Sequence, residues 1–354
     1  MKRSFKITTK RRKTKVVQIG NIAIGGRNPI VVQSMCNTRT QDVPATLKQI
    51  KSLAVAGCEL VRLAVKDQAD IKAFGEIKTK LRGQKFAMPL IADIHFDVRL
   101  AMAAIDAGAD KVRLNPGNTK DFWTALDYAK QKNIPVRIGF NSGSSSGFDF
   151  SLLKKIKYKN VILAAKSTDV VETINAYRKL SCLTDLPLHV GVTEAGTVLS
   201  GSIKSAVGIG ALLAEGIGDT IRVSLCGDPV LEINTAYKIL SALGLRHRGV
   251  EVIACPTCGR SDIDVAKLAG EVEAATKDIR EHLKIAVMGC AVNGPGEARQ
   301  ADFGIAGGHK EGLIFARGKI VKKVAEKSLV KELLILIANR SLRRVSDLAD
   351  DVAI

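Results

Sequence analysis

Eight short aliphatic runs recur along the chain, and they begin at residues 30, 59, 89, 111, 135, 160, 187 and 220. A polar or glycine-containing turn follows each run, and then an amphipathic stretch. A strand that is covered on both faces is a continuous aliphatic run, because neither face meets water. Eight strand–helix units predict an α/β fold, a closed (β/α)8 barrel of the TIM type. An open doubly wound sheet is the alternative, and the helical stretch after "IGFNSGSSSG" is the weakest of the eight.

The repeat stops at "GLRHRGV", residues 244–250. The pattern beyond it predicts a short strand that leads into Cys255, a helix over 263–283 and a strand in "IAVMG". Strands near 303 and over 313–323 and a closing helix complete a small α+β domain. We therefore expect a barrel domain with a basic N-terminal tail over 1–245 and a second domain over 246–354.

The charge balance favours an anionic partner. The chain carries 54 Lys and Arg against 35 Asp and Glu, a net charge of +19. Such a balance suits a phosphorylated substrate, an acidic protein or nucleic acid. Aromatic residues make up only 4% of the chain, which argues against a surface on which bases stack. We expect no nucleic-acid partner.

Cysteine usage and the N-terminus bear on the compartment. The seven cysteines follow no secretory signal, which is typical of a reducing compartment, so we expect a cytoplasmic protein. No apolar run is long enough to span a membrane. The N-terminal "MKRSFKITTKRRKTK" is predicted to be a solvated, frayed tail, with a short transit peptide as the weaker alternative.

Four of the predicted strands contain an arginine, namely Arg62, Arg113, Arg137 and Arg222. A charge inside a buried strand is costly unless it is paired. The C-terminal ends of the strands form the active-site mouth of this fold. Cations that converge there predict a site for a di- or polyphosphate, since arginine binds phosphate oxygens bidentately. The alternative is that these arginines form structural salt bridges. Extending each run adds polar residues to the mouth: Asp93, His95, Asn115, Asn141, Lys166, Glu194 and Ser224.

The roles of His95 and Glu194 stay open at this point. His95 is either a site residue or a satisfied core histidine, and Asp93 either orients it or competes with it. Glu194 ends an otherwise apolar strand. A glutamate that faces arginines is normally ionised, so it can accept or deliver a proton or simply pair with one of them.

A second constellation consists of cysteines in the C-terminal domain. Cys255 and Cys258 stand two residues apart in "CPTC", and Cys290 follows after 31 residues. Two thiolates on one tight turn can reach a single metal or cluster edge. The turn "NGPGE" can return the Glu297 carboxylate to the same metal as a fourth, replaceable ligand. The pattern favours an iron–sulfur cluster, and zinc is the alternative.

The remaining cysteines lie in the barrel half. Cys58 and Cys182 belong to helical stretches or their ends and are predicted to be buried. Cys36 and Cys226 lie near strand ends and could approach the mouth, but neither has a partner in the sequence.

Long motifs in chain order resemble the family of 4-hydroxy-3-methylbut-2-enyl diphosphate synthases over residues 15–340. The chain lacks the large extra domain that some members insert between barrel and cluster domain. Cys36 stands where the family more often has threonine. The motifs are "VVQSM", "QIKSLAVAGCELVRLAV", "ADIHFD", "KVRLNPGN", "RIGFNSGS", "HVGVTEAG", "IRVSL", "CPTCGR" and "CAVNGPGE".

The resemblance implies a reductive ring opening in the methylerythritol phosphate route to isoprenoids. The substrate would be 2-C-methyl-D-erythritol 2,4-cyclodiphosphate, and a [4Fe–4S] cluster would be held by Cys255, Cys258, Cys290 and Glu297. Asp93, His95 and Glu194 would be catalytic. The family's substrate contacts carry over onto Arg62, Arg113, Asn115, Arg137, Asn141, Lys166, Arg222 and Ser224.

The resemblance also implies partners. Flavodoxin or ferredoxin would donate electrons, and both are acidic proteins that suit a basic surface. A barrel mouth and a cluster on separate domains must meet for chemistry. The family solves this with a head-to-tail homodimer, in which the cluster domain of one chain caps the barrel of the other.

Overall fold

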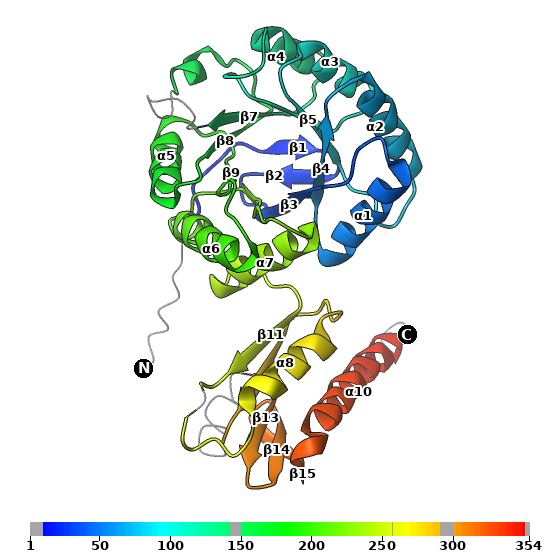
Figure 1. The fold of residues 1–354 in the computed structure, drawn as a ribbon, viewed down its shortest axis with the longest axis vertical. Helices are drawn as coiled ribbons and strands as arrows, with labels where there is room; N and C mark the ends of the chain where they lie inside the picture. Colours follow the sequence, from blue (N-terminus) through cyan, green and yellow to red (C-terminus); the bar gives the residue numbers. More distant parts are fainter. Residues whose placement is uncertain (1–9, 142–149, 257, 291–300, 351–354) are drawn as a thin grey trace. The chain divides into compact units, whose positions relative to one another are not determined.

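The computed structural model describes residues 10–141, 150–256, 258–290 and 301–350, with side chains described up to residue 339 except at residue 141. The chain divides into two compact units, Met1–Arg246 and His247–Ile354 (Figure 1). Each unit is described by itself.

The first unit is a parallel eight-stranded barrel, as predicted. The strand order is β8-β7-β6-β5-β4-β3-β10-β9, and a parallel bridge between Leu163 and Leu188 joins β8 to β9 and closes the sheet. Each aliphatic run supplies one strand. The strands are β3 (Val31–Met35), β4 (Leu60–Val65), β5 (Leu90–Ile94), β6 (Lys111–Leu114), β7 (Val136–Asn141), β8 (Val161–Lys166), β9 (His189–Val190) and β10 (Thr220–Ile221).

Helices alternate with these strands and surround the barrel in Figure 1. They are α1 (Val43–Ala56), α2 (Gln68–Leu81), α3 (Val98–Asp106), α4 (Phe122–Gln131), α5 (Val170–Leu183), α6 (Val198–Ala214) and α7 (Pro229–Ala242). The eighth predicted helix is wrong in the part that the structure describes: only the short 3-10 turn η1 (Ser151–Lys155) lies between β7 and β8.

Aspartates define where most of these helices begin. The side chains of Asp42, Asp67, Asp97, Asp169 and Asp228 each accept a backbone N–H of the first turn of the helix that they precede. Such a cap satisfies a donor that has no partner inside the helix and places negative charge at the positive end of the helix dipole. The caps therefore fix the loops that follow the C-terminal ends of the strands, where the site lies.

A hairpin that the sequence prediction missed covers the N-terminal ends of the barrel strands. Strands β1 (Val17–Ile19) and β2 (Ile22–Ile24) pair antiparallel. Val17, Ile19 and Ile24 pack against the first inward-facing residues of four barrel strands, namely Val31, Leu60, Ile91 and Ile162. This end of the barrel is therefore filled by apolar side chains, and polar side chains occupy the interior above it.

The chain just before this hairpin is anchored, so the prediction of a frayed tail is wrong for residues 10–15. The Arg12 guanidinium donates to the carbonyls of Thr184 and Leu186, and the Arg11 guanidinium contacts Asp219 at 3.2 Å. Residues 1–9 lie outside the described part.

The second unit is a five-stranded mixed sheet in the order β11-β12-β13-β14-β15. Its elements are β11 (Val250–Ala254), α8 (Val265–Thr276), β12 (Leu283–Met288), β13 (Phe303–Gly308), β14 (Glu311–Ala316), β15 (Lys319–Ala325), η2 (Glu326–Ser328) and α10 (Leu329–Asp350). Its core joins α8 and α10 to the sheet, through Leu268, Leu333 and Ile337 among others. Helix α8 ends earlier than predicted, at Thr276, and a turn with a hydrogen bond from Ile279 N to Thr276 O follows it.

Candidate active site and metal centre

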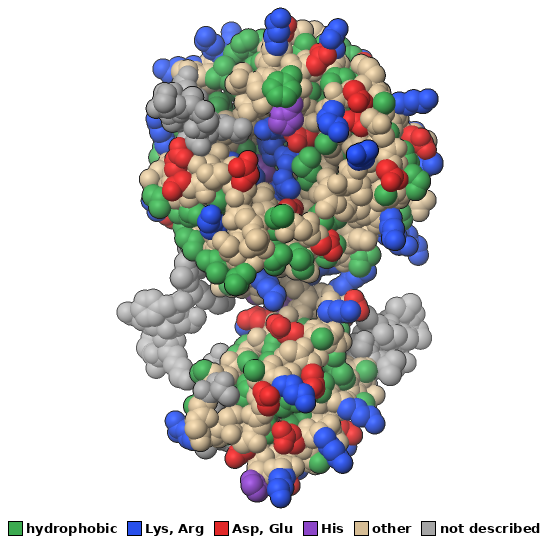
Figure 2. All heavy atoms as spheres, in the orientation of Figure 1, with side chains coloured by type: hydrophobic (Ala, Val, Ile, Leu, Met, Phe, Trp, Pro, Cys, Tyr) green, Lys and Arg blue, Asp and Glu red, His purple; other side chains and the backbone are tan. Residues whose placement is uncertain are grey.

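The predicted cations line the inside of the barrel. The sheet register pairs Asp93 with Arg113 and Arg113 with Arg137 on the neighbouring strands β5, β6 and β7. All three residues are more than 90% buried. Figure 2 shows Lys and Arg atoms gathered in the hollow at the centre of this face of the barrel unit.

Asp93 lies between two of these cations. Its Oδ2 lies 3.6 Å from Arg62 Nε, and its Oδ1 lies 3.4 Å from Arg113 NH1. Burial alone would raise the pKa of Asp93, but Arg62, then His95 and Arg113, outweigh burial and lower it. Asp93 is therefore an ionised counter-ion. Burial lowers the pKa of Arg62 to about 10, and Arg62 remains charged at neutral pH.

His95 follows β5 and contacts Arg113, the same arginine that pairs with Asp93. Arg113 NH1 lies 2.7 Å from His95 Nε2, and His95 Nε2 lies 3.8 Å from Asp93 Oδ2. The same Arg113 NH1 lies 3.3 Å from His95 Nδ1, so the guanidinium faces both ring nitrogens. The amide Nδ2 of Asn118 lies 3.2 Å from His95 Nδ1.

Two further cations, Arg137 and Lys166, have no carboxylate within 4 Å among the described residues. Burial first, then the neighbouring cations, lowers the pKa of both side chains well below the ordinary value. The Nε of Arg137 and the Nε of Arg113 have no hydrogen-bond acceptor in the part of the chain that the structure describes. Gly191 makes room for Lys166, since a Cβ at residue 191 would lie 2.7 Å from Lys166 Nζ. Buried donors without acceptors are what an incoming anion satisfies.

Arg222 is paired differently from the other arginines. Its guanidinium lies 3.3 Å from the buried carboxylate of Glu232 on α7, and Glu232 also accepts from Ser34 Oγ at 2.6 Å. Ser224 is half-buried nearby in the chain. The buried Asn115 accepts Gly117 N–H at 2.9 Å and so shapes the turn after β6. Residue 141 ends β7, and its side chain lies outside the described part.

Glu194 and Phe96 both have a positive φ angle. Glu194 has φ 49° and Phe96 has φ 68°, conformations that non-glycine residues adopt rarely. Glu194 is exposed in the loop after β9, and no ion pair holds it within the described chain. Phe96 is 70% exposed beside His95, with the ring centroids 5.9 Å apart. An exposed aromatic side chain on a strained backbone at the mouth was not predicted from the sequence.

The sequence analysis also missed two buried groups below the arginines. Lys111 opens β6 and is fully buried, and its Nζ has no hydrogen-bond partner among the residues described. The equally buried His189 on β9 accepts from Gln33 through Nδ1 at 3.0 Å, and burial lowers its pKa well below 6.5. Alternation along β6 was the available signal, because residues 111, 113 and 115 share one face of the strand.

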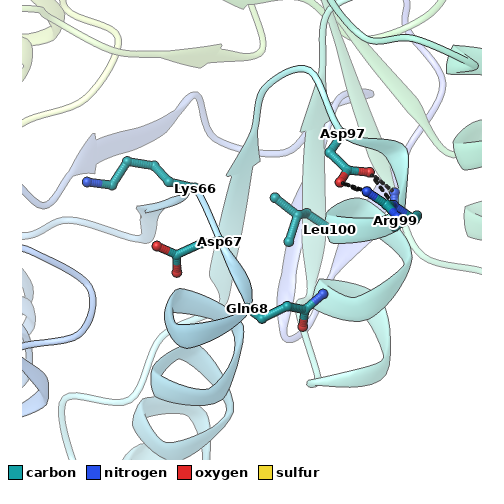
Figure 3. A pocket seen from close by; sticks show the side chains of 6 residues that line it. All are labelled: Lys66, Asp67, Gln68, Asp97, Arg99 and Leu100. Atoms are coloured by element: carbon teal, nitrogen blue, oxygen red, sulfur yellow. Dashed lines mark hydrogen bonds and ion pairs between the residues drawn. The ribbon is translucent and has the colours of Figure 1, made fainter.

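A separate hollow lies beside the loops after β4 and β5 (Figure 3). Arg99 pairs with Asp97 at 2.9 Å, so its charge is already balanced. The lining combines cations with carboxylates, which makes this hollow a poorer anion site than the barrel interior. It is lined by Lys66, Asp67, Gln68, Asp97, Arg99 and Leu100.

In the second unit, the cysteines follow neighbouring parallel strands. Cys255 comes directly after β11 and Cys290 comes two residues after β12, and the register pairs Ala254 with Val287. Both cysteines therefore lie at the same edge of the sheet, and the exposed Cys258 follows within three residues. Cys255 Sγ accepts the backbone N–H of Gly289 at 3.1 Å, a contact typical of a thiolate ligand. These residues fit a thiolate-bound metal or cluster, and Glu297 lies outside the described residues.

The barrel cysteines offer no such arrangement. Cys36 and Cys58 are buried, and burial raises the pKa of both thiols to about 12. Cys182 is exposed, so its predicted burial is wrong. Cys226 is exposed in the loop that precedes α7.

None of the described helices has the length and apolar character that crossing a bilayer requires.

Comparison with known proteins identifies both units. Residues 14–148 and 145–237 match the GcpE TIM-barrel domain, and residues 251–339 match the GcpE protein C-terminal domain. A 4-hydroxy-3-methylbut-2-en-1-yl diphosphate synthase (flavodoxin) from Caldanaerobacter subterraneus is 51% identical, over 92% of this chain and 96% of its own length. Enzymes of the same name from Fusobacterium nucleatum and Geobacter sulfurreducens are 49% and 47% identical, over 92% and 91% of this chain and 97% and 96% of their own. These matches confirm the resemblance seen in the motifs: the chain belongs to the GcpE family of 4-hydroxy-3-methylbut-2-en-1-yl diphosphate synthases.

Proposed function

We propose that this chain converts 2-C-methyl-D-erythritol 2,4-cyclodiphosphate to (E)-4-hydroxy-3-methylbut-2-enyl diphosphate in isoprenoid biosynthesis. Two electrons and two protons enter, the ring opens at a carbon–oxygen bond, and one hydroxyl leaves as water. The observation that carries the proposal is the excess of buried cations in the barrel. Among the described residues, Arg113 has Asp93 within 4 Å, whereas Arg137 and Lys166 have no carboxylate that close, and a cyclic diphosphate would supply the missing negative charge.

The barrel residues would bind and orient the substrate. The Nε atoms of Arg113 and Arg137, which have no acceptor within the described part of the chain, and the ammonium of Lys166 are donors for phosphate oxygens. Arg62 keeps Asp93 ionised, and Arg113 keeps the lone pair of His95 engaged. The predicted contacts at Asn115, Asn141, Arg222 and Ser224 belong to the same proposal. Of these, Arg222 would act while it stays paired with Glu232.

The second unit would hold the redox group. Members of this family are iron–sulfur enzymes. We assign a [4Fe–4S] cluster to Cys255, Cys258, Cys290 and Glu297, because three thiolates suit iron and a carboxylate is a weaker, replaceable ligand. When bound, the cluster supplies the two electrons of the ring opening. Zinc would supply none.

Glu194 is the proposed proton donor to the hydroxyl that leaves as water. It is an exposed carboxylate at the mouth, and no ion pair binds it within the described residues. Asp93 is bound by two arginines and is a poor proton donor. Asp93 and His95 therefore act by orienting the bound substrate.

The proposed partners follow from charge and from an exposed apolar stripe. Flavodoxin, which the relatives' names carry, or ferredoxin would donate electrons to a chain of net charge +19 in the cytoplasm. Leu199, Ile203 and Val207 recur every fourth residue on α6 and are 75%, 57% and 56% exposed. Such a stripe suits a two-fold contact between barrels. In the resulting homodimer the cluster domain, 246–354, of one chain would serve the barrel domain, 1–245, of the other.

The reaction is tested anaerobically with cluster-loaded protein, the cyclic diphosphate and reduced flavodoxin. Phosphorus NMR distinguishes the cyclic from the linear diphosphate. We expect the linear allylic diphosphate to form in proportion to the electrons delivered. A fully loaded, reduced protein that leaves the cyclic diphosphate intact would contradict the proposal.

The site between chains is tested by mixing two inactive variants, Glu194→Gln and Cys290→Ala. After subunit exchange, a mixed dimer has one intact barrel facing one intact cluster, so activity should return. Exchange is verified with tags of different size. If verified mixed dimers stay inactive, barrel and cluster of one chain work together.

A further inference from the structure

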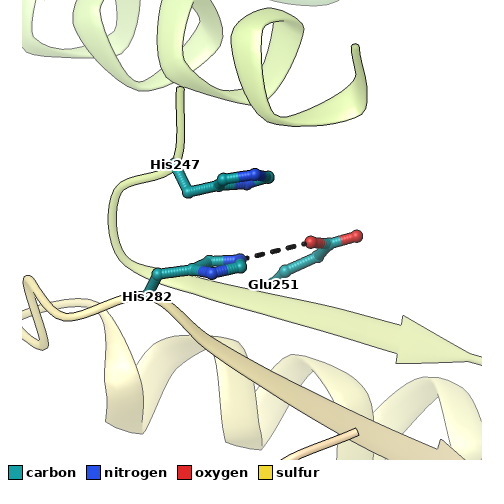
Figure 4. A group of neighbouring side chains, drawn as sticks. All are labelled: His247, Glu251 and His282. Carbon is teal, nitrogen blue, oxygen red and sulfur yellow. Dashed lines mark ion pairs between the residues drawn. The ribbon is translucent and has the colours of Figure 1, made fainter. Parts of the chain in front are cut away.

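Two histidines and a glutamate come together in the second unit, away from its cysteines. His247 precedes β11, Glu251 lies in β11, and His282 directly precedes β12. The register of these parallel strands pairs Glu251 with Lys284, which brings the three side chains to one end of the sheet. Figure 4 shows the two imidazole rings stacked, with the Glu251 carboxylate beside them.

The spacing of the three side chains is close to that of a metal site. One ligand atom from each residue lies within 4.8 Å of the others. The ring centroids are 4.1 Å apart, and His282 Nε2 lies 3.6 Å from Glu251 Oε2. Tetrahedral zinc with bonds of about 2.0–2.1 Å holds its ligand atoms about 3.4 Å apart. Both histidines are exposed, so their rings can turn out of the stack and direct their nitrogens to one ion.

One oxygen of the Glu251 carboxylate accepts no hydrogen bond from the described residues. Its Oε2 is shielded from solvent and has no hydrogen-bond partner among the described residues. Two possible donors, His282 Nε2 and Lys284 Nζ, lie 3.6 and 3.8 Å from this oxygen, beyond hydrogen-bond length. A buried acceptor of this kind calls for a partner. The Lys284 side chain is 38% exposed and can turn to water when a cation takes its place.

The donor set selects the kind of cation. Imidazole nitrogens suit zinc and its neighbours in the first transition row rather than calcium or magnesium. Two histidines and one glutamate with a fourth position for water form a known zinc coordination.

This cluster is distinct from the cysteine site. β11 and β12 run parallel, with the His–Glu–His group at their N-terminal ends and Cys255 and Cys290 beyond their C-terminal ends. The four residues from Glu251 to Cys255 span about 13 Å of strand. One ion cannot use both sets of ligands.

We propose that His247, Glu251 and His282 form a second metal site, which binds a zinc-type divalent ion independently of the cysteines. The ion ties the segment before β11 to the segment before β12, at the start of the second unit.

Equilibrium dialysis of the full-length, cluster-loaded protein against Zn²⁺, under anaerobic conditions, tests the site. The wild type should take up one zinc per chain beyond its cluster iron. The His247→Gln/His282→Gln variant should bind this zinc at least tenfold more weakly. Loss of a residue that only hydrogen-bonds to a metal ligand already weakens metal binding by about 10- to 100-fold. His309→Gln is the matched control, because it removes an exposed histidine of the same unit outside the cluster and should bind like the wild type.

Zinc-edge X-ray absorption distinguishes the ligands. The proposal predicts a shell of nitrogen and oxygen at about 2.0–2.1 Å, whereas zinc on cysteines would show sulfur at about 2.3 Å. A sulfur shell, absence of extra zinc in the wild type, or unchanged affinity in the double variant would each overturn the proposal. Circular dichroism confirms that the double variant is folded. If it is not, His282→Gln alone is measured against the same tenfold criterion.

Discussion

Arg113 and His95 are joined by a hydrogen bond of 2.7 Å from the guanidinium to Nε2, inside a barrel where Arg113 also neutralises Asp93 at 3.4 Å. One arginine thus contacts both the histidine and the aspartate, and its Nε has no acceptor among the described residues. The residue is both a support for the mouth and a donor to an incoming anion.

Arg113→Ala should therefore raise the KM for the cyclic diphosphate strongly and leave the visible absorbance of the cluster unchanged. Loss of a hydrogen bond from a charged donor costs about 2–3 kcal/mol, which corresponds to roughly 30- to 150-fold. Steady-state kinetics at saturating reductant measure this. Arg99→Ala, which removes an exposed arginine paired with Asp97, should keep the wild-type KM. A wild-type KM in Arg113→Ala would remove this residue from the site.

His189 makes the barrel sensitive to acid. Its folded-state pKa lies well below 6.5, first through burial and then through the cations Lys166, Arg137, Lys111 and Arg62. The unfolded chain, with a pKa of about 6.5, therefore binds more protons on this residue than the folded chain does in the window between the two values. The free energy of unfolding should fall as the pH drops below about 6.5, by at most about 1.4 kcal/mol per pH unit from this residue.

Urea unfolding between pH 7.5 and 5, followed through Trp123 fluorescence, measures this dependence. Trp123 is the single tryptophan of the chain and belongs to α4 of the barrel. His189→Gln should flatten the dependence, whereas the exposed His309→Gln should follow the wild type. Parallel curves for wild type and His189→Gln would show that another group titrates.

The barrel could be predicted because its strands are buried on both faces and so read as uninterrupted aliphatic runs. The β1–β2 hairpin was missed, although Val17, Ile19, Ile22 and Ile24 alternate with other residues around a Gly-Asn turn. The basic composition of the N-terminus concealed its order, since Arg12 is held by backbone carbonyls rather than by any motif. Because every residue has a backbone carbonyl, the sequence does not indicate which carbonyl accepts a hydrogen bond from Arg12.

The presence of charged side chains inside the barrel could be predicted from the strand arginines, but their pairing could not. Arginines inside apolar strands signal an anion or a salt bridge, and the structure contains both outcomes: Arg222 is paired with Glu232, whereas Arg137 is unpaired within the described chain. Which arginine meets which carboxylate depends on the register between strands and on α7, and local sequence does not encode it. The positive φ of Glu194 likewise depends on the path of the loop after β9, which the local sequence does not reveal.

Ile203→Glu should convert the proposed dimer to monomers. The substitution places a charge at the centre of the apolar stripe on α6, where the partner would exclude water, so the dimer should dissociate at least about tenfold more readily. Sedimentation velocity measures the change. Val55→Glu, on the exposed face of α1, is the control and should leave the mass unchanged. An unaltered dimer in Ile203→Glu would place the contact elsewhere.

Glu297→Cys should retain the cluster but lose catalytic turnover. A fourth thiolate suits iron better than a carboxylate, so iron and sulfide content should equal or exceed that of the wild type. Turnover with a chemical reductant should collapse, because the replaceable ligand position is lost. Glu297→Ala should instead lose its cluster faster in air. An active Glu297→Cys protein with a full cluster is incompatible with the assigned role of Glu297.

Calorimetric titration of the cyclic diphosphate into cluster-loaded protein without any reductant tests most directly whether the buried cations exist to bind this substrate. We predict one site per chain in the wild type, with affinity that falls as salt is added. Arg137→Met, which removes a buried guanidinium whose Nε has no acceptor among the described residues, should weaken binding by roughly 10- to 150-fold while the cluster absorbance stays unchanged. Equal affinity in the wild type and Arg137→Met, or no binding by the wild type, would contradict the account.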